Sequence, residues 1–265
     1  MKFAASDNWW GSEFCERLVL AKKYGFRAIE DNIWTGVDLE KARQTLIETG
    51  VKSTALLLRN TDSDKRHLMS AKHGMVYEGN MDVYIESFNQ TAAAAKMLDV
   101  QNIIMVAGAT RDDVSYEQQF ENCVITLKTL SKMAEDSGLT IVLEPLNVLV
   151  DHKGYFLSKT EDAVRMIKAV DSPNCKILFD IYHQQITEGN VIRNIRNNIE
   201  HIGYFHIADN PGRKQPGTGE LNYRNIFKAI EETGYDGWLA FECSSTVDTD
   251  TLVKEMHELI DPFDK

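Results

Sequence analysis

The feature that most constrains the fold is a regular alternation of short apolar runs with longer amphipathic segments. Eight short runs have the length and composition of buried strands. They are predicted at residues 2–6, 26–30, 51–58, 101–106, 139–143, 176–180, 202–207 and 238–242. Segments with helical spacing follow them, at about residues 12–24, 38–49, 81–98, 116–137, 160–170, 186–199, 223–233 and 249–260. The chain is therefore predicted to be built from repeated strand–helix units.

Eight such units, without a linker-like change in composition, predict a single (β/α)8 TIM barrel that spans residues 1–265 as one domain. A doubly wound open sheet is the alternative, but no G-x-G-x-x-G motif follows the first predicted strand. One connection, residues 59–79, is long and polar. Loops of this length are often lids or binding loops, and a solvated surface excursion is an equally good interpretation.

Charge limits the partners that we expect. The chain has 40 acidic against 29 basic side chains, a formal net charge of −11. Such a surface repels phosphate backbones and anionic lipids, so we expect no nucleic acid and no membrane as a partner. The expected partner is a small molecule. An anionic substrate would have to be attracted by a local cation, either a bound metal ion or an arginine.

Cysteine usage indicates a reducing compartment. The four cysteines are Cys15, Cys123, Cys175 and Cys243, and no C-x-x-C pair is present. We expect all four thiols to be free. Together with an N-terminus that has no apolar signal core, this predicts a cytoplasmic protein.

Four of the predicted strands end in, or lead directly into, a residue that can bind a metal ion. These residues are Glu144, Asp180, His206 and Glu242, separated by 36, 26 and 36 residues. Each interval suits one strand–helix unit, so four consecutive units would place one polar side chain each at the carboxyl end of the barrel. That is the end at which barrel enzymes carry their active sites.

Three carboxylates and one imidazole suit one divalent metal ion, Mg²⁺ or Mn²⁺, better than zinc. Without a cation, three converging carboxylates would repel one another. Each residue also has a simpler interpretation: Asp180 could cap the next helix, and a single histidine such as His206 is more often part of the core. The joint pattern is what favours the metal site.

The segment after residue 207 is rich in glycine and proline and is predicted to form a shaped loop. It contains Arg213, which could bind the acid group of a small substrate. His183 lies three residues after Asp180 and could bond a substrate oxygen. A plain loop cation and a surface histidine are the alternatives for these two residues.

Several longer runs resemble a known family: LEPLN (143–147), FDIYHQQITEG (179–189), IADNPGRKQPGTGELNY (207–223) and ETGYDGW (232–238). Over about residues 140–243 the chain is similar to hydroxypyruvate isomerase, within the wider xylose-isomerase-like group of sugar isomerases and epimerases. The resemblance implies a TIM barrel with a divalent metal ion held by Glu144, Asp180, His206 and Glu242. It also implies acid/base roles for Glu144 and Glu242, and substrate contacts for His183 and Arg213.

Two departures leave the substrate open. Hydroxypyruvate isomerases often have Gln where His206 stands, whereas ketose 3-epimerases have His. Those epimerases also carry an acid where this chain has Val148 and Leu149. A ketose 3-epimerase and an oxo-tetronate isomerase therefore stay as alternatives, with a metal-dependent abasic-site endonuclease and a non-enzymatic sugar-acid binding barrel as remote ones.

The expected reaction is an aldose–ketose type isomerisation of a small hydroxy-keto acid, from hydroxypyruvate to tartronate semialdehyde or a similar conversion. A carboxylate would remove the proton of a C–H bond, and the resulting enediolate would be stabilised by the metal ion. Glu242 is the first choice as base and Glu144 is its partner. The sequence does not fix the oligomeric state, and a homo-oligomer is compatible with it.

Overall fold

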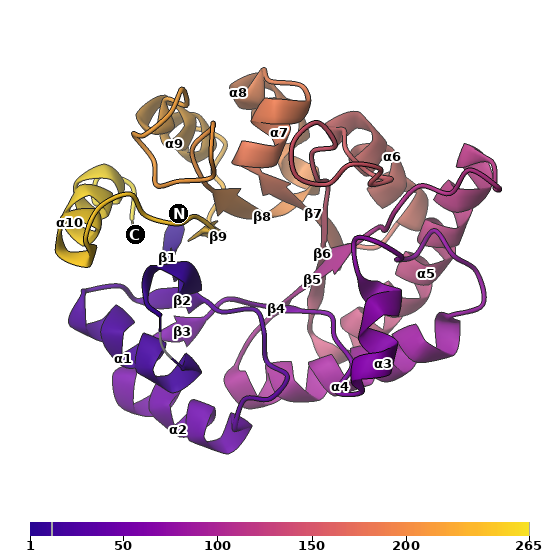
Figure 1. The fold of residues 1–265 in the computed structure, drawn as a ribbon, viewed down its shortest axis with the longest axis horizontal. Coiled ribbons are helices and arrows are strands. Elements are labelled where there is room, and N and C mark those ends of the chain that lie inside the picture. Colours follow the sequence, from indigo (N-terminus) through magenta and orange to yellow (C-terminus); the bar gives the residue numbers. More distant parts are fainter. Residues whose placement is uncertain (12, 265) are drawn as a thin grey trace.

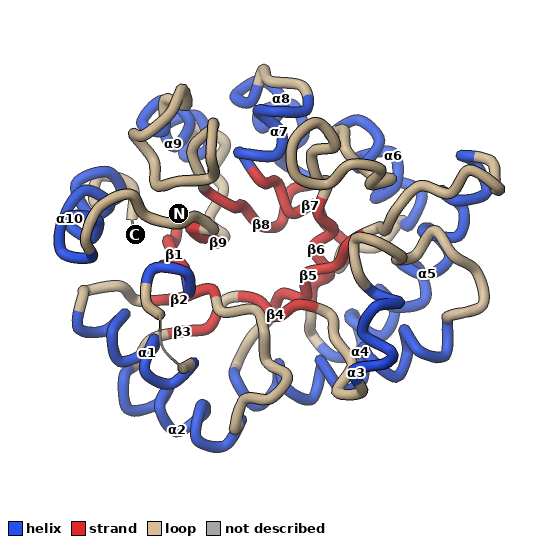
Figure 2. Tube along the Cα trace, in the orientation of Figure 1, coloured by secondary structure: helices blue, strands red, loops and turns tan. Residues whose placement is uncertain are grey.

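The computed structural model describes residues 1–11 and 13–264. Within them, nine strands form one parallel sheet with the order β3-β2-β1-β9-β8-β7-β6-β5-β4. Its edge strands, β3 (Lys52–Ser53) and β4 (Ala55–Leu57), are consecutive pieces of one run separated only by Thr54. The sheet therefore closes on itself, and Figure 2 shows the ring of strands inside a ring of helices. The predicted TIM barrel is confirmed.

The strands are short and parallel, as the sequence predicts. The other seven are β1 (Lys2–Ser6), β2 (Ala28–Glu30), β5 (Asn102–Val106), β6 (Thr140–Glu144), β7 (Cys175–Asp180), β8 (Ile202–Ile207) and β9 (Trp238–Phe241). β1 pairs with β9, so the first and last strands of the chain meet and help to close the ring (Figure 1).

Helices cover the outside of the barrel. They are α1 (Phe14–Lys23), α2 (Leu39–Thr49), α3 (Ser63–Arg66), α4 (Met81–Leu98), α5 (Tyr116–Ser137), α6 (Thr160–Val170), α7 (Ile181–Thr187), α8 (Val191–Asn198), α9 (Tyr223–Glu231) and α10 (Thr249–Ile260). Short 3₁₀ helices lie at η1 (Asp7–Trp9), η2 (His67–Met69) and η3 (Ile199–His201). Among the residues that the structure describes, no helix is both long and apolar enough to span a membrane.

Three local predictions need correction. The single strand expected over 51–58 is divided at Thr54. The single helix expected over 186–199 is two helices, because Gly189 and Asn190 adopt left-handed φ angles of 60° and 52° that end one helix before the next begins. The loop at 59–79 contains α3 and η2 rather than being wholly irregular. The expected start of the first helix, at residue 12, lies outside the described residues.

The interior of the barrel is filled by one side chain from each strand run. This layer consists of Ala4, Ala28, Ala55, Ile104, Val142, Leu178, Tyr204 and Ala240. Alanines on one side face larger side chains on the other, and the Tyr204 hydroxyl reaches across to Thr54 Oγ1 at 2.6 Å. Because side chains alternate along a strand, the residue two positions further on also points inward, one layer nearer the carboxyl end.

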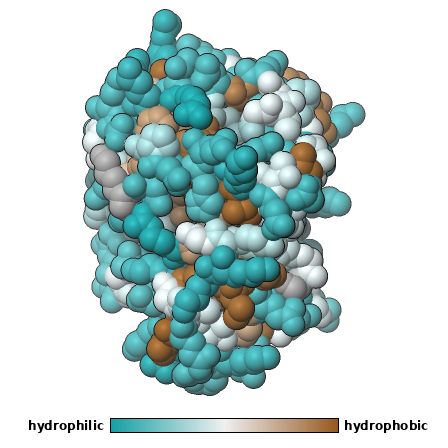
Figure 3. Space-filling view, turned by 90° about the vertical axis from the view of Figure 1, so that its left-hand side faces the viewer, coloured by the Kyte–Doolittle hydropathy of each residue, from teal (hydrophilic) through white to brown (hydrophobic). Residues whose placement is uncertain are grey.

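The outer core explains why the helices stay on the barrel. In α5 the buried side chains Cys123, Leu127, Leu130 and Ala134 follow helical spacing and form one apolar stripe against the sheet. Each large apolar side chain buried in this way stabilises the fold by about 1.5–3 kcal/mol. All four cysteines are free, as predicted. Figure 3 shows one face of the molecule, where apolar side chains are scattered among hydrophilic ones.

Candidate functional site

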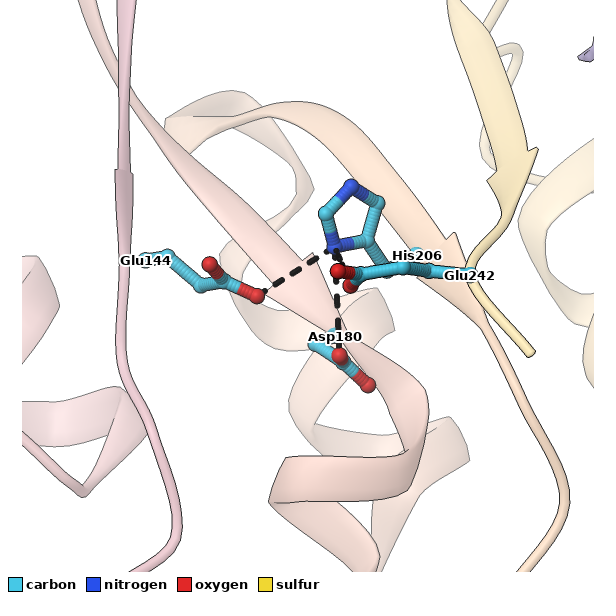
Figure 4. Close-up of side chains that lie close together, drawn as sticks. All are labelled: Glu144, Asp180, His206 and Glu242. Atoms are coloured by element: carbon cyan, nitrogen blue, oxygen red, sulfur yellow. Dashed lines mark hydrogen bonds and ion pairs between the residues drawn. The ribbon is translucent and has the colours of Figure 1, made fainter. Parts of the chain in front are cut away.

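The four predicted metal ligands lie together at the carboxyl ends of four neighbouring strands. Glu144, Asp180 and His206 each follow an interior residue by two positions on β6, β7 and β8, and Glu242 does so directly after β9. The strand period of two therefore turns all four inward at the same level. One ligand atom from each lies within 4.8 Å of the others. Figure 4 shows Glu144 and Glu242 approaching from opposite sides, with Asp180 and His206 between them.

His206 lies at the centre of this cluster and is 1 % exposed. Its Nδ1 atom is 2.7 Å from Glu242 Oε2, 3.2 Å from Glu144 Oε1 and 3.8 Å from Asp180 Oδ2. Its Nε2 atom points the other way, to the carboxylate of Glu30 at 3.0 Å. Through its two nitrogens, the imidazole thus contacts carboxylates from the ends of four other strands, β2, β6, β7 and β9.

Burial and charge shift the titration of the cluster. Burial raises the pKa of Glu144 to about 7. For His206, burial acts to lower the pKa, but the surrounding carboxylates, Glu30 and Glu242 foremost, raise it well above its ordinary value. Burial acts to raise the pKa of Glu242, but the charges of His206 and Arg213 hold it well below its ordinary range. The cluster therefore already attracts positive charge.

The residues fit a divalent cation by their chemistry. Carboxylates dominate the cluster, and carboxylate oxygen with imidazole nitrogen is a donor set for Mg²⁺, Mn²⁺ or Zn²⁺. Four carboxylates, those of Glu30, Glu144, Asp180 and Glu242, face the imidazoles of His206 and His183 and the guanidinium of Arg213. A divalent cation would neutralise the excess negative charge, and repulsion among buried carboxylates is otherwise costly.

His183 lies beside the cluster on α7, where it is 1 % exposed. Asp180 caps that helix by accepting a hydrogen bond from the His183 backbone N–H at 3.1 Å, so the strand end positions both residues. The Nδ1 atom of His183 faces the Asn147 side-chain amide at 2.6 Å and the Asn147 backbone N–H at 3.3 Å. Burial lowers the pKa of His183 to about 4, so at neutral pH the imidazole is neutral.

The amide of Asn147 has a fixed orientation. Its oxygen accepts from the backbone N–H groups of Val150 and Asp151, and its nitrogen donates to the Asp151 carboxylate at 2.7 Å. Asn147 therefore presents N–H groups to His183 Nδ1, which must accept. A neutral imidazole carries one proton, so that proton lies on His183 Nε2.

Arg213 completes the site from the loop after β8. Its Nη2 atom lies 2.8 Å from Asp180 Oδ2 and 2.5 Å from Glu242 Oε2. Its Nη1 atom lies 2.6 Å from His183 Nε2. The residue has a left-handed φ of 53°, which is uncommon for a side chain other than glycine and costs on the order of 1–3 kcal/mol. The loop holds the Arg213 backbone in this conformation, and the guanidinium then contacts Asp180 and Glu242 of the cluster.

Asp209 organises that loop. It is fully buried, and its carboxylate accepts hydrogen bonds from the backbone N–H groups of Asn210, Gly217, Gly219 and Leu221 at 2.8–3.1 Å. At Gly219 a side chain has no space, since a Cβ atom would lie 2.1 Å from the Asn210 carbonyl oxygen. The loop that carries Arg213 therefore has a conformation fixed by hydrogen bonds and close packing.

All six predicted site residues lie in one region, and the structure adds three residues that the sequence analysis missed. Glu30 contacts His206, and Asn147 contacts His183. Asp209 holds the loop that carries Arg213. The pattern does signal Glu30, because it follows interior Ala28 by two positions at the end of β2, as Glu144 follows Val142. Asn147 and Asp209 act through loop geometry, which has no sequence period.

The fold and the cluster define a class of protein: a TIM barrel with a polar, acidic active-site-like centre at the carboxyl ends of its strands. The chain belongs to the xylose isomerase-like TIM barrel family, which matches residues 18–262. This family membership confirms the predicted resemblance.

Three curated relatives cover almost the whole chain. It is 29 % identical to hydroxypyruvate isomerase of Escherichia coli over 95 % of this chain and 94 % of that protein. It is 30 % identical to a putative hydroxypyruvate isomerase of Danio rerio, over 91 % and 89 %. It is 29 % identical to 2-oxo-tetronate isomerase of Cupriavidus necator, over 91 % and 92 %. These relatives confirm the prediction of an enzyme of the isomerase class.

Solved structures agree on the fold. A structure named as an AP endonuclease, family 2, from Brucella melitensis has a TM-score of 0.88 at 24 % identity and covers 100 % of this chain and 99 % of that one. The IOLI protein, whose structure holds a zinc atom, has a TM-score of 0.77 at 18 % identity, covering 99 % of each chain. At these identities the likeness is one of fold.

Proposed function

We propose that this protein is a divalent-metal-dependent isomerase of a small hydroxy-keto acid, with hydroxypyruvate as the first candidate substrate. The observation that carries the proposal is the convergence of three carboxylates and an imidazole on one point beside Arg213. The names of the relatives, hydroxypyruvate isomerase and 2-oxo-tetronate isomerase, support the same class of substrate.

Glu144, Asp180, His206 and Glu242 would hold the metal ion. The excess of oxygen ligands favours Mg²⁺ or Mn²⁺, and the zinc atom in one structural neighbour keeps Zn²⁺ as an alternative. A bound cation supplies Lewis-acid polarisation of a carbonyl oxygen.

Arg213 and His183 would bind the substrate. Arginine only donates hydrogen bonds, and Asn147 leaves His183 with a proton on Nε2, so two donors face each other 2.6 Å apart. A substrate oxygen that accepts from both groups would satisfy the two donors, and a carboxylate or carbonyl oxygen is such an acceptor. The pair therefore favours an oxygen-rich, anionic ligand in an otherwise acidic protein.

Glu242 and Glu144 would transfer the proton. They extend from β9 and β6 toward the cluster from opposite sides, so each could reach a different face or carbon of one small substrate. Glu242 is the first choice as base, because its side chain is 30 % exposed and Glu144 lies deeper. Glu242 would remove the proton from the hydroxyl-bearing carbon to give an enediolate. A proton returned to the adjacent carbon, together with passage of the hydroxyl proton to the former carbonyl oxygen, would complete the isomerisation.

A ketose 3-epimerase is the second candidate. Epimerisation removes a proton from one face of a carbon and returns it to the other, which requires acid/base groups on both sides. The opposed Glu144 and Glu242 meet that requirement as well. The two candidates differ in substrate charge, because only the keto acid would use the full charge of Arg213.

The test is a substrate panel with metal-depleted enzyme. We expect no turnover of hydroxypyruvate after chelation, recovery with Mn²⁺ or Mg²⁺, and slower turnover of neutral ketoses. DNA containing an abasic site is included as a further substrate, because one structural neighbour is named as an AP endonuclease. Full activity in a preparation shown to be metal-free, or turnover of neutral ketoses or abasic DNA without turnover of any keto acid, would refute the proposal.

A further inference from the structure

Glu30 lies outside the four-residue cluster yet bonds directly to its histidine. It ends β2, on the opposite side of His206 from Glu144 and Glu242, and is 3 % exposed. Both of its carboxylate oxygens lie 3.0 Å from His206 Nε2. The distances between Nε2 and this carboxylate are as short as ordinary hydrogen bonds to a charged acceptor.

Geometry gives the two nitrogens of His206 different roles. Nδ1 points into the cluster of Glu144, Asp180 and Glu242, and Nε2 points only to Glu30 among the contacts of the described residues. A metal ion binds imidazole through a nitrogen without a proton, while the other nitrogen keeps its N–H. A carboxylate at Nε2 accepts that N–H and so directs the free lone pair of Nδ1 to the cluster.

We propose that Glu30 is a positioning residue that fixes the proton of His206 on Nε2 and thereby makes Nδ1 a metal ligand. This inference rests on the metal site of the proposed function. Glu30 needs no contact with substrate for this role, because it acts only through His206. Its own orientation is supported by Asn32, whose side-chain amide donates to Glu30 Oε1 at 3.4 Å.

The neighbouring Asp31 offers a matched control. It is also buried, at 1 % exposure, and its carboxylate pairs with Arg17, at 2.5 Å from Nη2. Replacing Asp31 by Asn removes a buried carboxylate one residue away without touching His206. A general effect of local negative charge would therefore appear in both variants, whereas fixation of the His206 proton involves Glu30 alone.

The experiment compares Mn²⁺ affinity by isothermal titration calorimetry for wild type, Glu30→Gln, Glu30→Asp and Asp31→Asn. Glutamine can donate its amide N–H to Nε2 and so favours the wrong tautomer. We expect Glu30→Gln to weaken Mn²⁺ binding about 10- to 100-fold, the usual effect of losing such a partner. Glu30→Asp keeps the acceptor and should retain part of the affinity, and Asp31→Asn should bind Mn²⁺ much as wild type does.

Nitrogen-15 NMR of histidine in the Mg²⁺-loaded protein adds a readout that a merely structural role would not change. We expect the His206 proton on Nε2 in wild type and a loss of this preference in Glu30→Gln. Wild type that binds no divalent metal would refute the proposed function itself. Wild type that binds Mn²⁺ together with an unchanged Glu30→Gln affinity, or an equal loss in Asp31→Asn, would refute the role of Glu30 alone.

Discussion

At the scale of residues, the site depends on which side chains carry protons. The opposed carboxylates of Glu144 and Glu242 share one imidazole and differ in environment, since Glu144 is buried deeply and Glu242 also contacts Arg213. Pairs of acids in different environments are typical of acid/base catalysis, because each group can then take a separate role.

Glu242→Gln should reduce kcat by about 10²- to 10⁴-fold, the usual contribution of a positioned acid/base group, while much of the metal affinity remains. Glutamine keeps the shape and one oxygen ligand but cannot accept the proton. The measurement is steady-state kinetics on hydroxypyruvate, with Mn²⁺ content checked by elemental analysis. In D₂O the wild-type product should carry deuterium. Product without solvent deuterium, with a variant of near-normal rate, would contradict this assignment.

At the scale of elements, the strands position the acids and the loop after β8 positions the arginine. The loop depends on the buried Asp209 carboxylate and on the absence of a side chain at Gly219. The backbone N–H groups of Gly217 and Gly219 donate to Asp209 only while Gly219 lies close to Asn210. Changes in the loop should therefore affect substrate binding through Arg213.

Gly219→Ala should displace the loop, because the new methyl group would overlap the Asn210 carbonyl oxygen. Overpacking of this kind typically costs about 1–3 kcal/mol of stability. We expect a lower Tm by differential scanning fluorimetry and a higher KM for a keto acid. Gly11→Ala is the control, since a Cβ atom there meets nothing within 4 Å. Equal behaviour of the two variants would show that the loop is not constrained as described.

The predictable elements were those with strong periodicity. The helices at 81–98, 116–137, 160–170 and 249–260 have the predicted bounds, because apolar spacing and end signals agree there. The break between α7 and α8 was missed because two residues with left-handed backbone interrupt an otherwise continuous helical pattern. Four members of the site could be predicted because they stand at strand ends. The hydrogen bonds between Asn147 and His183 depend on the conformation of a loop, which has no sequence period.

At the scale of the whole molecule, the acidic cluster at the carboxyl end of the barrel makes both metal binding and fold stability depend on pH. In the metal-free protein the raised pKa of Glu144, about 7 against an ordinary 4.5, makes its ionisation destabilising as pH rises between these values. Protonated His206 stabilises the fold fully below about pH 6.5, and this contribution is lost as pH rises through its raised pKa. Both groups make the metal-free fold weaker at alkaline pH.

A metal ion requires both groups without protons, so its stabilising effect should grow with pH. We expect the rise in Tm on adding Mn²⁺ to metal-free protein to be larger at about pH 8.5 than at about pH 6. Thermal unfolding at the two pH values, with Asp180→Asn as the control that lacks a ligand, measures it. A rise in Tm that is the same at both pH values, or the same in Asp180→Asn, would argue against binding at this cluster.

The most direct measurement of the central claim is the location of a bound ion. Crystals of the protein grown with Mn²⁺ and measured near the manganese absorption edge would show anomalous scattering at the metal. We expect one strong peak among Glu144, Asp180, His206 and Glu242, with Nδ1 of His206 as the nitrogen ligand. A protein saturated with Mn²⁺ in solution that shows no peak there, or a peak only elsewhere, would contradict it.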